Sequence, residues 1–253
     1  MVLNQSMNVL EGAGSMVSKC IIALDFPNKS NVNEFLTRFG SEKLYLKVGM
    51  ELYYSEGPSL IYSLKEKGHS IFLDLKLHDI PNTVKSAMKQ IASLEVDMVN
   101  VHAAGGKRMM SAAVEGLEIG ARNKQRPLCV AVTQLTSTSQ ETLKKDILID
   151  YSLEETILKY ASFAKDSGLD GVVCSALEVP LLNKQLGLDF ITVTPGIRTK
   201  DSDVNDQVRV VSPGEARVLG STYIVVGRNI THAKNPLLTY ENIVKEWQGN
   251  LIG

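Results

Sequence analysis

Eight short apolar segments recur along the chain, and stretches of helical periodicity lie between them. Most of the apolar segments are rich in Val, Ile or Leu, which is typical of strands covered by helices on one face. They begin at Lys19, Lys43, Ser70, Asp97, Pro127, Asp170, Asp189 and Thr222. Apolar residues at helical spacing predict helices over residues 31–39, 58–67, 83–94, 106–123, 153–167 and 213–219.

This alternation predicts an α/β fold, a single (β/α)8 TIM barrel, because eight strand–helix units fill a length close to the usual barrel size of roughly 250 residues. A doubly wound open sheet alternates in the same way and is the alternative architecture, but the count of eight favours the barrel. We expect residues 18–253 to form one barrel domain. Residues 1–17, which contain Gly12 and Gly14, are expected to be a disordered N-terminal extension.

The third apolar segment has period two. Its odd positions from Ile71 to Leu77 are apolar, whereas Asp74, Lys76 and His78 occupy even positions. This alternation predicts a strand with one apolar face and one charged face. In a barrel the apolar face packs against helices, and the charged face points into the interior near the end where α/β barrels place their chemistry.

A helix signal follows this strand at once. Asp79 is suited to cap a helix, and Pro81 is suited to its first turn. The alternative interpretation of Asp74 and Lys76 is a structural ion pair, but buried pairs are weak stabilisers because desolvation offsets most of the attraction. A third charge at Asp79 favours a functional site.

Further charged residues fall at the ends of other predicted strands. Asp25 ends the first strand, Lys47 lies on the second, and Arg198 and Arg228 follow the seventh and eighth. Loops seven and eight of such barrels frequently bind phosphate, which suits the planar arginine fork. The alternative is that these arginines pair with nearby surface acids. Two long loops, residues 133–150 and 195–212, are expected to be functional lids.

Composition excludes several classes of protein. The chain has 253 residues, 44% of them hydrophobic, and a net charge of −1, so a nucleic-acid footprint is not expected. No apolar run is long enough for a membrane span, and the N-terminus lacks the features of a secretory signal. Cys20, Cys129 and Cys174 are widely spaced and suggest buried thiols in a reducing cytoplasm. The four histidines show no metal-ligand spacing, so no metal is expected.

Six short motifs together resemble the orotidine 5'-monophosphate decarboxylase family. They are ALDF at 23–26, KVGMEL at 47–52, DLKLHDIPNTV at 74–84, LTS at 135–137, TPGIR at 194–198 and VVGRNI at 225–230. The resemblance extends from about Lys19 to the C-terminus, with the motifs in family order. It implies conversion of orotidine monophosphate to uridine monophosphate in pyrimidine synthesis, without a metal or organic cofactor. It also implies a homodimer in which Asp79 reaches the partner's site.

The resemblance assigns roles to individual positions. The implied catalytic residues are Lys47, Asp74, Lys76 and Asp79. Asp25, Lys47, Asp79 and Thr83 would bind the ribose, and Arg198, Gln207, Gly227 and Arg228 the phosphate. Either Thr136 or Ser137 would face the pyrimidine, and Ile80 and Pro195 complete the implied substrate-binding set.

Elementary chemistry agrees with Lys76 as the proton donor. Loss of carbon dioxide from C6 leaves an in-plane carbanion that only the protein can stabilise, and a fixed ammonium can both stabilise it and protonate it. The nearest alternative enzyme is a magnesium-dependent sugar-phosphate decarboxylase or aldolase on the same barrel. The non-enzyme alternative is a phosphate-ligand binding barrel without catalysis.

Overall fold

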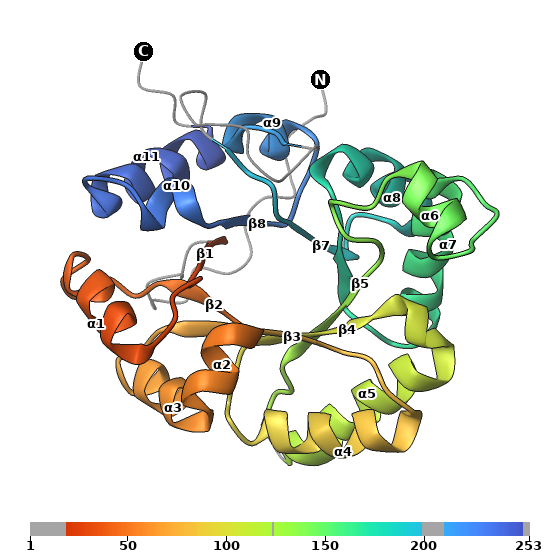
Figure 1. Ribbon diagram of the computed structural model, residues 1–253, viewed down its shortest axis with the longest axis horizontal. Helices are drawn as coiled ribbons and strands as arrows, with labels where there is room; N and C mark the ends of the chain where they lie inside the picture. Colours follow the sequence, from red (N-terminus) through yellow and green to blue (C-terminus); the bar gives the residue numbers. More distant parts are fainter. Residues whose placement is uncertain (1–18, 123, 199–209, 250–253) are drawn as a thin grey trace, which may run out of the picture.

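Eight parallel strands close into one barrel in the computed structural model, which describes residues 19–122, 124–198 and 210–249. Each strand pairs with its sequence neighbours, and β1 closes the ring against β8 (Figure 1). The strands are β1 Cys20–Ala23, β2 Tyr45–Gly49, β3 Ser70–Leu77, β4 Met98–His102, β5 Leu128–Val132, β6 Gly171–Val173, β7 Ile191–Thr194 and β8 Tyr223–Val226. The predicted barrel and all eight predicted strands are confirmed, and the open sheet is excluded.

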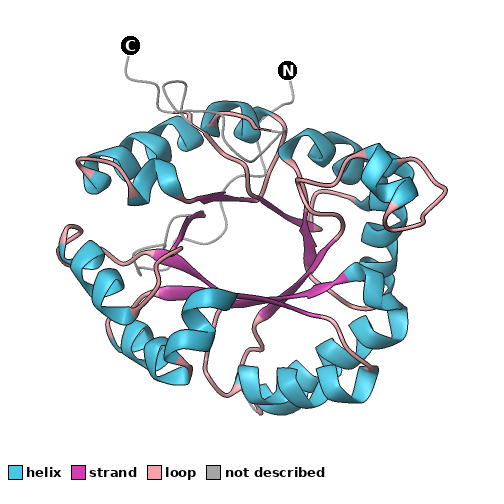
Figure 2. Cartoon of the chain, in the orientation of Figure 1, coloured by secondary structure: helices cyan, strands magenta, loops and turns pink. Residues whose placement is uncertain are grey.

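Helices form an outer ring around the strands (Figure 2). The six predicted helices are present as α1 Lys29–Thr37, α3 Pro58–Glu66, α4 Pro81–Ala92, α5 Gly106–Ala121, α7 Leu153–Asp166 and α9 Pro213–Val218. Their predicted limits were misplaced by up to two residues. For example, α1 starts at Lys29 because the side chain of Asn28 accepts a hydrogen bond from the backbone N–H of Asn31.

Several helices were not predicted. They are α2 Met50–Glu56, α6 Gln140–Lys145, α8 Val179–Leu186, α10 Arg228–Thr231 and α11 Pro236–Gln248, together with the 3-10 turns η1 Ala103–Gly105 and η2 Ala176–Glu178. Helix α6 lies inside the segment 133–150 that we predicted to be a long loop. Ser139 caps α6 by accepting from the backbone N–H of Thr142, so this loop is partly helical.

The apolar residues form two layers. Inside the barrel, Ile21, Tyr45, Phe72, Met98 and Val225 pack together from five strands. Alternate residues of the same strands point outward and pack against the helices in a larger layer. The period-two pattern therefore has the predicted consequence, since the even positions of β3 face the interior.

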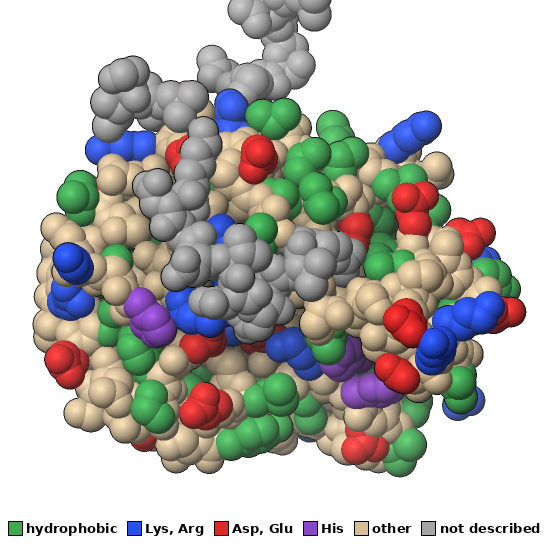
Figure 3. Space-filling view, turned by 45° about the horizontal axis from the view of Figure 1, so that its top comes forward, with side chains coloured by type: hydrophobic (Ala, Val, Ile, Leu, Met, Phe, Trp, Pro, Cys, Tyr) green, Lys and Arg blue, Asp and Glu red, His purple; other side chains and the backbone are tan. Residues whose placement is uncertain are grey.

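The surface has a mixed distribution of charge. Acidic and basic side chains are interspersed on the face shown in Figure 3. Among the described residues, no helix combines the length and the apolar character that crossing a membrane would require.

The predicted N-terminal extension, residues 1–17, lies outside the described residues, and so does Gln207.

Candidate active site

Four charged side chains from three adjacent strands form a connected array at the C-terminal end of the barrel. The Lys47 Nζ lies 3.3 Å from Asp25 Oδ1 and 3.3 Å from Asp74 Oδ2. The Lys76 Nζ lies 2.6 Å from Asp74 Oδ1. The array thus alternates acid and base in the order Asp25, Lys47, Asp74, Lys76.

Burial and charge act in opposite directions on the two central members. Desolvation by itself lowers the pKa of Lys47, but the carboxylates of Asp74 and Asp25 outweigh it, and the net pKa is raised. Desolvation likewise raises the pKa of Asp74, but Lys47 and Lys76 outweigh it, and the net pKa is lowered. Both groups therefore remain ionised at neutral pH.

The backbone of β3 is irregular where it presents these charges. The pairing with β4 moves from Leu73↔Val99 to Leu77↔Val101, so β3 holds more residues than β4 across this interval. Lys76 sits within it at φ +52°, a left-handed conformation that costs a non-glycine residue about 1 kcal/mol or more. The simple alternation predicted from the sequence does not describe this bulge.

A cavity of about 540 Å³ opens beside the array. Many of the predicted site residues line it: Asp25, Lys47, Asp74, Lys76, Thr136, Ser137, Pro195, Arg198, Gly227 and Arg228. They come from the C-terminal ends of β1, β2, β3, β7 and β8 and from the loop after β5. The barrel therefore brings together residues that lie more than 200 positions apart in sequence.

Two of the residues that line the cavity are arginines. Arg198 and Arg228 stand on the loops after β7 and β8, where this fold frequently binds phosphate. The backbone N–H of Arg198 donates to the carbonyl of Val211 at 2.9 Å, which ties the two described ends of loop seven together. The lysine and aspartate array lies at the ends of β1 to β3, so the same cavity is lined by two arginines and by an alternating set of charges.

Three predicted residues do not line this cavity. Asp79, Ile80 and Thr83 are exposed on the segment that leads from β3 into α4. The Asp79 carboxylate accepts from the backbone N–H of Ile80 and makes no ion pair with any described residue. A single chain does not test the prediction that Asp79 reaches the partner's site.

Sequence reasoning missed other residues of the site. Val132, Gln134, Leu135, Cys174, Thr231 and His232 also line the cavity. Asn100 was missed as well: its side chain donates to Asp74 Oδ1 at 2.7 Å and accepts from the backbone N–H of Lys76 at 2.7 Å. A polar residue at an inward position of the apolar strand MVNVH was the available signal.

The described residues contain no group of three or more His, Cys, Asp or Glu side chains that could hold a metal ion. His78 and His102 have ring centroids 5.8 Å apart, and neither lines the cavity. Burial, followed by the charges of His78 and Lys76, lowers the pKa of His102.

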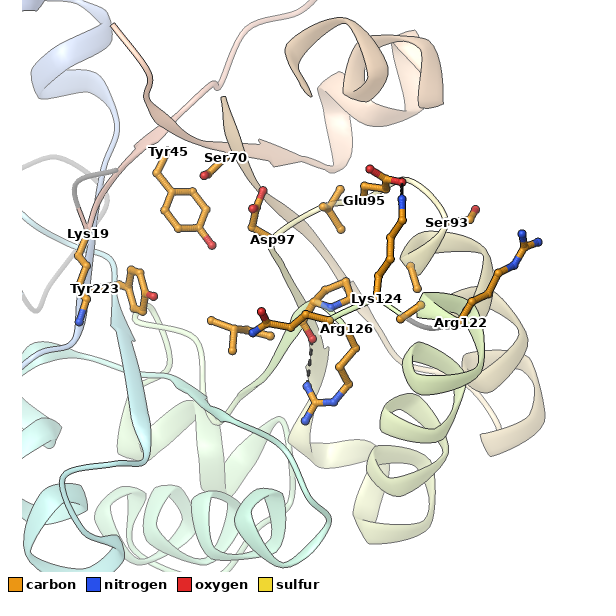
Figure 4. Close-up of a pocket in the computed structure, with 17 residues that line it drawn as sticks. Lys19, Tyr45, Ser70, Ser93, Glu95, Asp97, Arg122, Lys124, Arg126 and Tyr223 are labelled. Carbon is orange, nitrogen blue, oxygen red and sulfur yellow. Dashed lines mark hydrogen bonds and ion pairs between the residues drawn. The ribbon is translucent and has the colours of Figure 1, made fainter. Parts of the chain in front are cut away.

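A second, larger cavity of about 880 Å³ lies at the opposite, N-terminal end of the barrel (Figure 4). Its charged residues are largely paired with one another or with neighbours. Lys124 pairs with Glu95, and Arg126 donates to both carboxylate oxygens of Asp170. Residues at this end of the fold mainly serve stability, so we assign the chemistry to the smaller cavity.

Comparison with known proteins shows the family of the chain. A family model described as "Orotidine 5'-phosphate decarboxylase / HUMPS family" matches residues 18–243. The chain belongs to this family.

Named relatives are similar over nearly their whole length. A protein of Bacillus cereus (strain G9842) named orotidine 5'-phosphate decarboxylase is 63% identical over 235 residues, which cover 92% of this chain and 99% of the relative. A Bacillus mycoides (strain KBAB4) protein of the same name shows the same identity and coverage.

Solved structures share the fold. The orotidine 5'-phosphate decarboxylase of Lactobacillus acidophilus has a TM-score of 0.83 at 42% identity and covers 91% of this chain and 99% of its own. An uncharacterised conserved protein of Geobacillus kaustophilus has a TM-score of 0.82 at 52% identity and covers 90% of this chain and 99% of its own.

Proposed function

We propose that this member of the family decarboxylates orotidine 5'-monophosphate to uridine 5'-monophosphate in pyrimidine biosynthesis, as a carboxy-lyase. The observation that supports this most directly is the ammonium of Lys76, held 2.6 Å from Asp74 at the wall of a cavity that two arginines also line. A nucleotide has the matching chemistry, with a reactive pyrimidine at one end and a phosphate dianion at the other.

In the proposed reaction, the bond between C6 and the carboxylate breaks and its electron pair remains on C6. The Lys76 ammonium stabilises this charge and then transfers its proton to C6, which yields uridine monophosphate and carbon dioxide. Lys76 is left neutral and regains a proton from solvent. Preorganised charge of this kind needs no reorganisation during the reaction, which is the main advantage of a folded site over water.

Asp74 has a supporting role in this proposal. Its carboxylate is buried between Lys47 and Lys76, so it keeps the Lys47 ammonium charged and directs the ammonium of Lys76. Repulsion of the substrate carboxylate by Asp74 would also accelerate the reaction, but destabilisation of the ground state is a contested explanation of rate enhancement. We assign the larger part of the contribution of Asp74 to the rate to its orientation of Lys76.

The remaining contacts bind the substrate. Arg198, Gly227 and Arg228, with Gln207 from outside the described residues, are proposed for the phosphate, and Asp25 and Lys47 for the ribose. Thr136 or Ser137 would contact the pyrimidine edge, and both line the cavity. Binding energy from the remote phosphate can be used to organise the reacting end.

The magnesium-dependent alternative is not favoured by the array. Asp25 and Asp74 both contact the ammonium of Lys47, which supplies the positive charge that a cation would otherwise bring. We expect the rate to be unchanged by a chelator or by added divalent ions. A requirement for bound metal would revive the alternative.

The direct test is loss of orotidine monophosphate absorbance during incubation with purified protein. We expect wild-type protein to be active and Lys76→Ala to be folded but nearly inactive. Lys107→Ala, which removes an exposed lysine paired with Asp166 on the outer ring, is the matched control and should retain activity. A Lys76→Ala variant that keeps more than about a tenth of the activity, a barrier change below about 1.4 kcal/mol, would remove Lys76 from the donor role.

We further propose that residues 18–253 act as one catalytic domain and that two copies assemble into a homodimer with shared sites. Ile80 is 66% exposed and Met50 is 44% exposed, on the elements that follow β3 and β2 at the mouth of the barrel. Exposed apolar side chains beside polar ones are typical of an interface between subunits. Asp79 and Thr83, exposed beside Ile80, would then reach the partner's cavity.

The proposed location is the cytoplasm. Cys20, Cys129 and Cys174 are buried thiols that form no disulfide, which fits a reducing compartment.

A further inference from the structure

Asn100 is buried beneath the charged array and is only 1% exposed. It belongs to β4, whose outward residues Val99 and Val101 pack in the outer layer, so Asn100 points into the barrel. An amide at such a position is costly unless its hydrogen bonds are made.

Each end of this amide has one partner in the array. The Nδ2 donates to Asp74 Oδ1 at 2.7 Å, and the Oδ1 accepts from the backbone N–H of Lys76 at 2.7 Å. Asp74 Oδ1 is also the atom that receives the Lys76 ammonium at 2.6 Å. Asn100 is thus bonded to both ends of the arrangement that points Lys76 into the cavity.

The need for this amide arises from the bulge in β3. The pairing with β4 moves from Leu73↔Val99 to Leu77↔Val101, so the regular ladder is interrupted at Lys76. The side chain of Asn100 supplies the acceptor for the Lys76 N–H at this interruption. It thereby stabilises the left-handed backbone at Lys76, which a lysine rarely adopts.

We propose that Asn100 is a positioning residue for decarboxylation, which fixes the direction of the Lys76 ammonium and the orientation of the Asp74 carboxylate. The inference rests on the proposed function. The amide performs both tasks at once, whereas a carboxylate cannot donate to Asp74 and an aliphatic side chain can neither donate nor accept.

The first measurement compares kcat and KM for orotidine monophosphate in wild-type protein, Asn100→Ala and Asn100→Asp. Loss of a hydrogen bond to a charged group predicts a fall in kcat of about ten- to a hundred-fold for Asn100→Ala. KM should change by less than about three-fold, because the proposed phosphate contacts at Arg198 and Arg228 are untouched.

Thr192→Val is the matched control. Thr192 is fully buried in β7 and hydrogen-bonds to Thr222, on the outer face of the barrel and away from the array. This variant should lose thermal stability while keeping kcat. If Asn100→Ala also loses only stability and keeps kcat within about two-fold, the positioning role is wrong.

The second measurement does not depend on turnover. In Asn100→Asp a carboxylate replaces the donor beside Asp74, so the pKa of Asp74 should rise, as followed by carbon NMR of labelled aspartate in the free enzyme. The groups that face Asp74 are Lys47 of β2, Lys76 of β3 and His102 of β4, with Asp25, in the loop after β1, beyond Lys47. In the same variant, the pH below which kcat/KM falls should also move to a higher value.

These two measurements separate the inference from the proposed function. Inactive wild-type protein would refute the function, while the NMR titration would still test the contact between Asn100 and Asp74. Active wild-type protein with an unchanged Asp74 titration and an unchanged pH dependence of kcat/KM in Asn100→Asp would refute the inference alone.

Discussion

At the scale of single residues, the two carboxylate oxygens of Asp74 are shared among three donors. Oδ1 receives Lys76 and Asn100, and Oδ2 faces Lys47. Removal of one member of a buried charged cluster leaves the others uncompensated, which is strongly destabilising. Asp74→Ala should therefore lose both stability and activity, whereas a loss confined to activity is expected for Lys76→Ala, whose side chain is partly exposed to the cavity.

The arginine on the eighth loop gives a prediction about binding. Arg228→Ala should weaken binding of uridine monophosphate by about 1.5 to 3 kcal/mol, the usual worth of hydrogen bonds to charged groups. Binding of uridine, which has no phosphate, should change little. Calorimetric titration of both ligands gives the difference, and equal losses for nucleotide and nucleoside would assign Arg228 a structural role.

His69 predicts a dependence of stability on pH. It is buried at the start of β3 and its Nδ1 accepts from the backbone N–H of Leu44 at 3.2 Å. Burial, with Lys43 and Lys67 nearby, lowers the pKa of His69 to about 4 from 6.5. The folded protein therefore favours the neutral ring, so the stability that His69 contributes is complete above pH 6.5 and is lost as the pH falls towards 4.

We expect acidification from pH 7 to 4 to cost the wild-type protein of order 3 kcal/mol through this group, in addition to other losses. His69→Asn keeps an acceptor near the Nδ1 position and does not titrate, so its free energy of unfolding should fall less steeply over this range. Denaturant melts at several pH values measure the slope, with the exposed His78→Asn as control. Parallel slopes for wild-type protein and His69→Asn would contradict the assignment.

At the scale of elements, helices α4 and α5 pack closely enough to require glycine. A Cβ on Gly116 of α5 would lie 2.3 Å from the backbone oxygen of Lys85 in α4. Helix α4 also contains Thr83, and Asp79 lies two residues before its start.

Gly116→Ala should destabilise the protein by about 1 to 3 kcal/mol, the range for overpacking against a backbone that must move. In Gly214→Ala of α9, by contrast, the new Cβ would meet only the flexible side chain of Glu246, at 3.1 Å. We expect that control to stay within about 0.5 kcal/mol of wild-type protein, as surface changes usually do. Similar melting temperatures for the two variants would contradict the prediction, because they would show that α4 and α5 can accommodate the added Cβ.

At the scale of the whole molecule, closure of the barrel decides which residues share a site. Asp25, Lys47, Asp74 and Arg228 come from distant parts of the sequence, yet they surround one cavity because all their strands run parallel. Asp79 and Thr83 remain outside this cavity in a single chain. A shared site between two subunits would give them a role.

Complementation tests the shared site. If Asp79 serves the partner, mixing inactive Asp79→Ala with inactive Lys76→Ala creates mixed dimers with one intact site and one doubly damaged site. Random exchange between equal amounts should restore about a quarter of the wild-type activity, since half the dimers are mixed and each has one working site. If Asp79 serves its own chain, every site keeps a lesion, and a mixture that stays inactive after demonstrated exchange refutes the shared site.

The sequence predicted the barrel and the charged residues that line the cavity. Strand number and order follow from the repeated apolar segments, and the inward direction of Asp74 follows from the two-residue period of a strand. Residues at the C-terminal ends of parallel strands must meet, so Lys47, Arg198 and Arg228 were predictable as well. These are local rules, and one sequence is enough to apply them.

Other features of the site and of the helices depend on contacts between parts of the chain that are distant in sequence. Asn100 belongs to the site because a bulge in β3 leaves the Lys76 N–H facing the neighbouring strand, and pairing between strands is not encoded in either strand alone. The short helices α2 and α6 depend on packing and end contacts more than on periodicity, because a helix of two turns shows too few repeats. The position of Asp79 also depends on tertiary structure, because the turn from β3 into α4 directs it away from the cavity of its own chain.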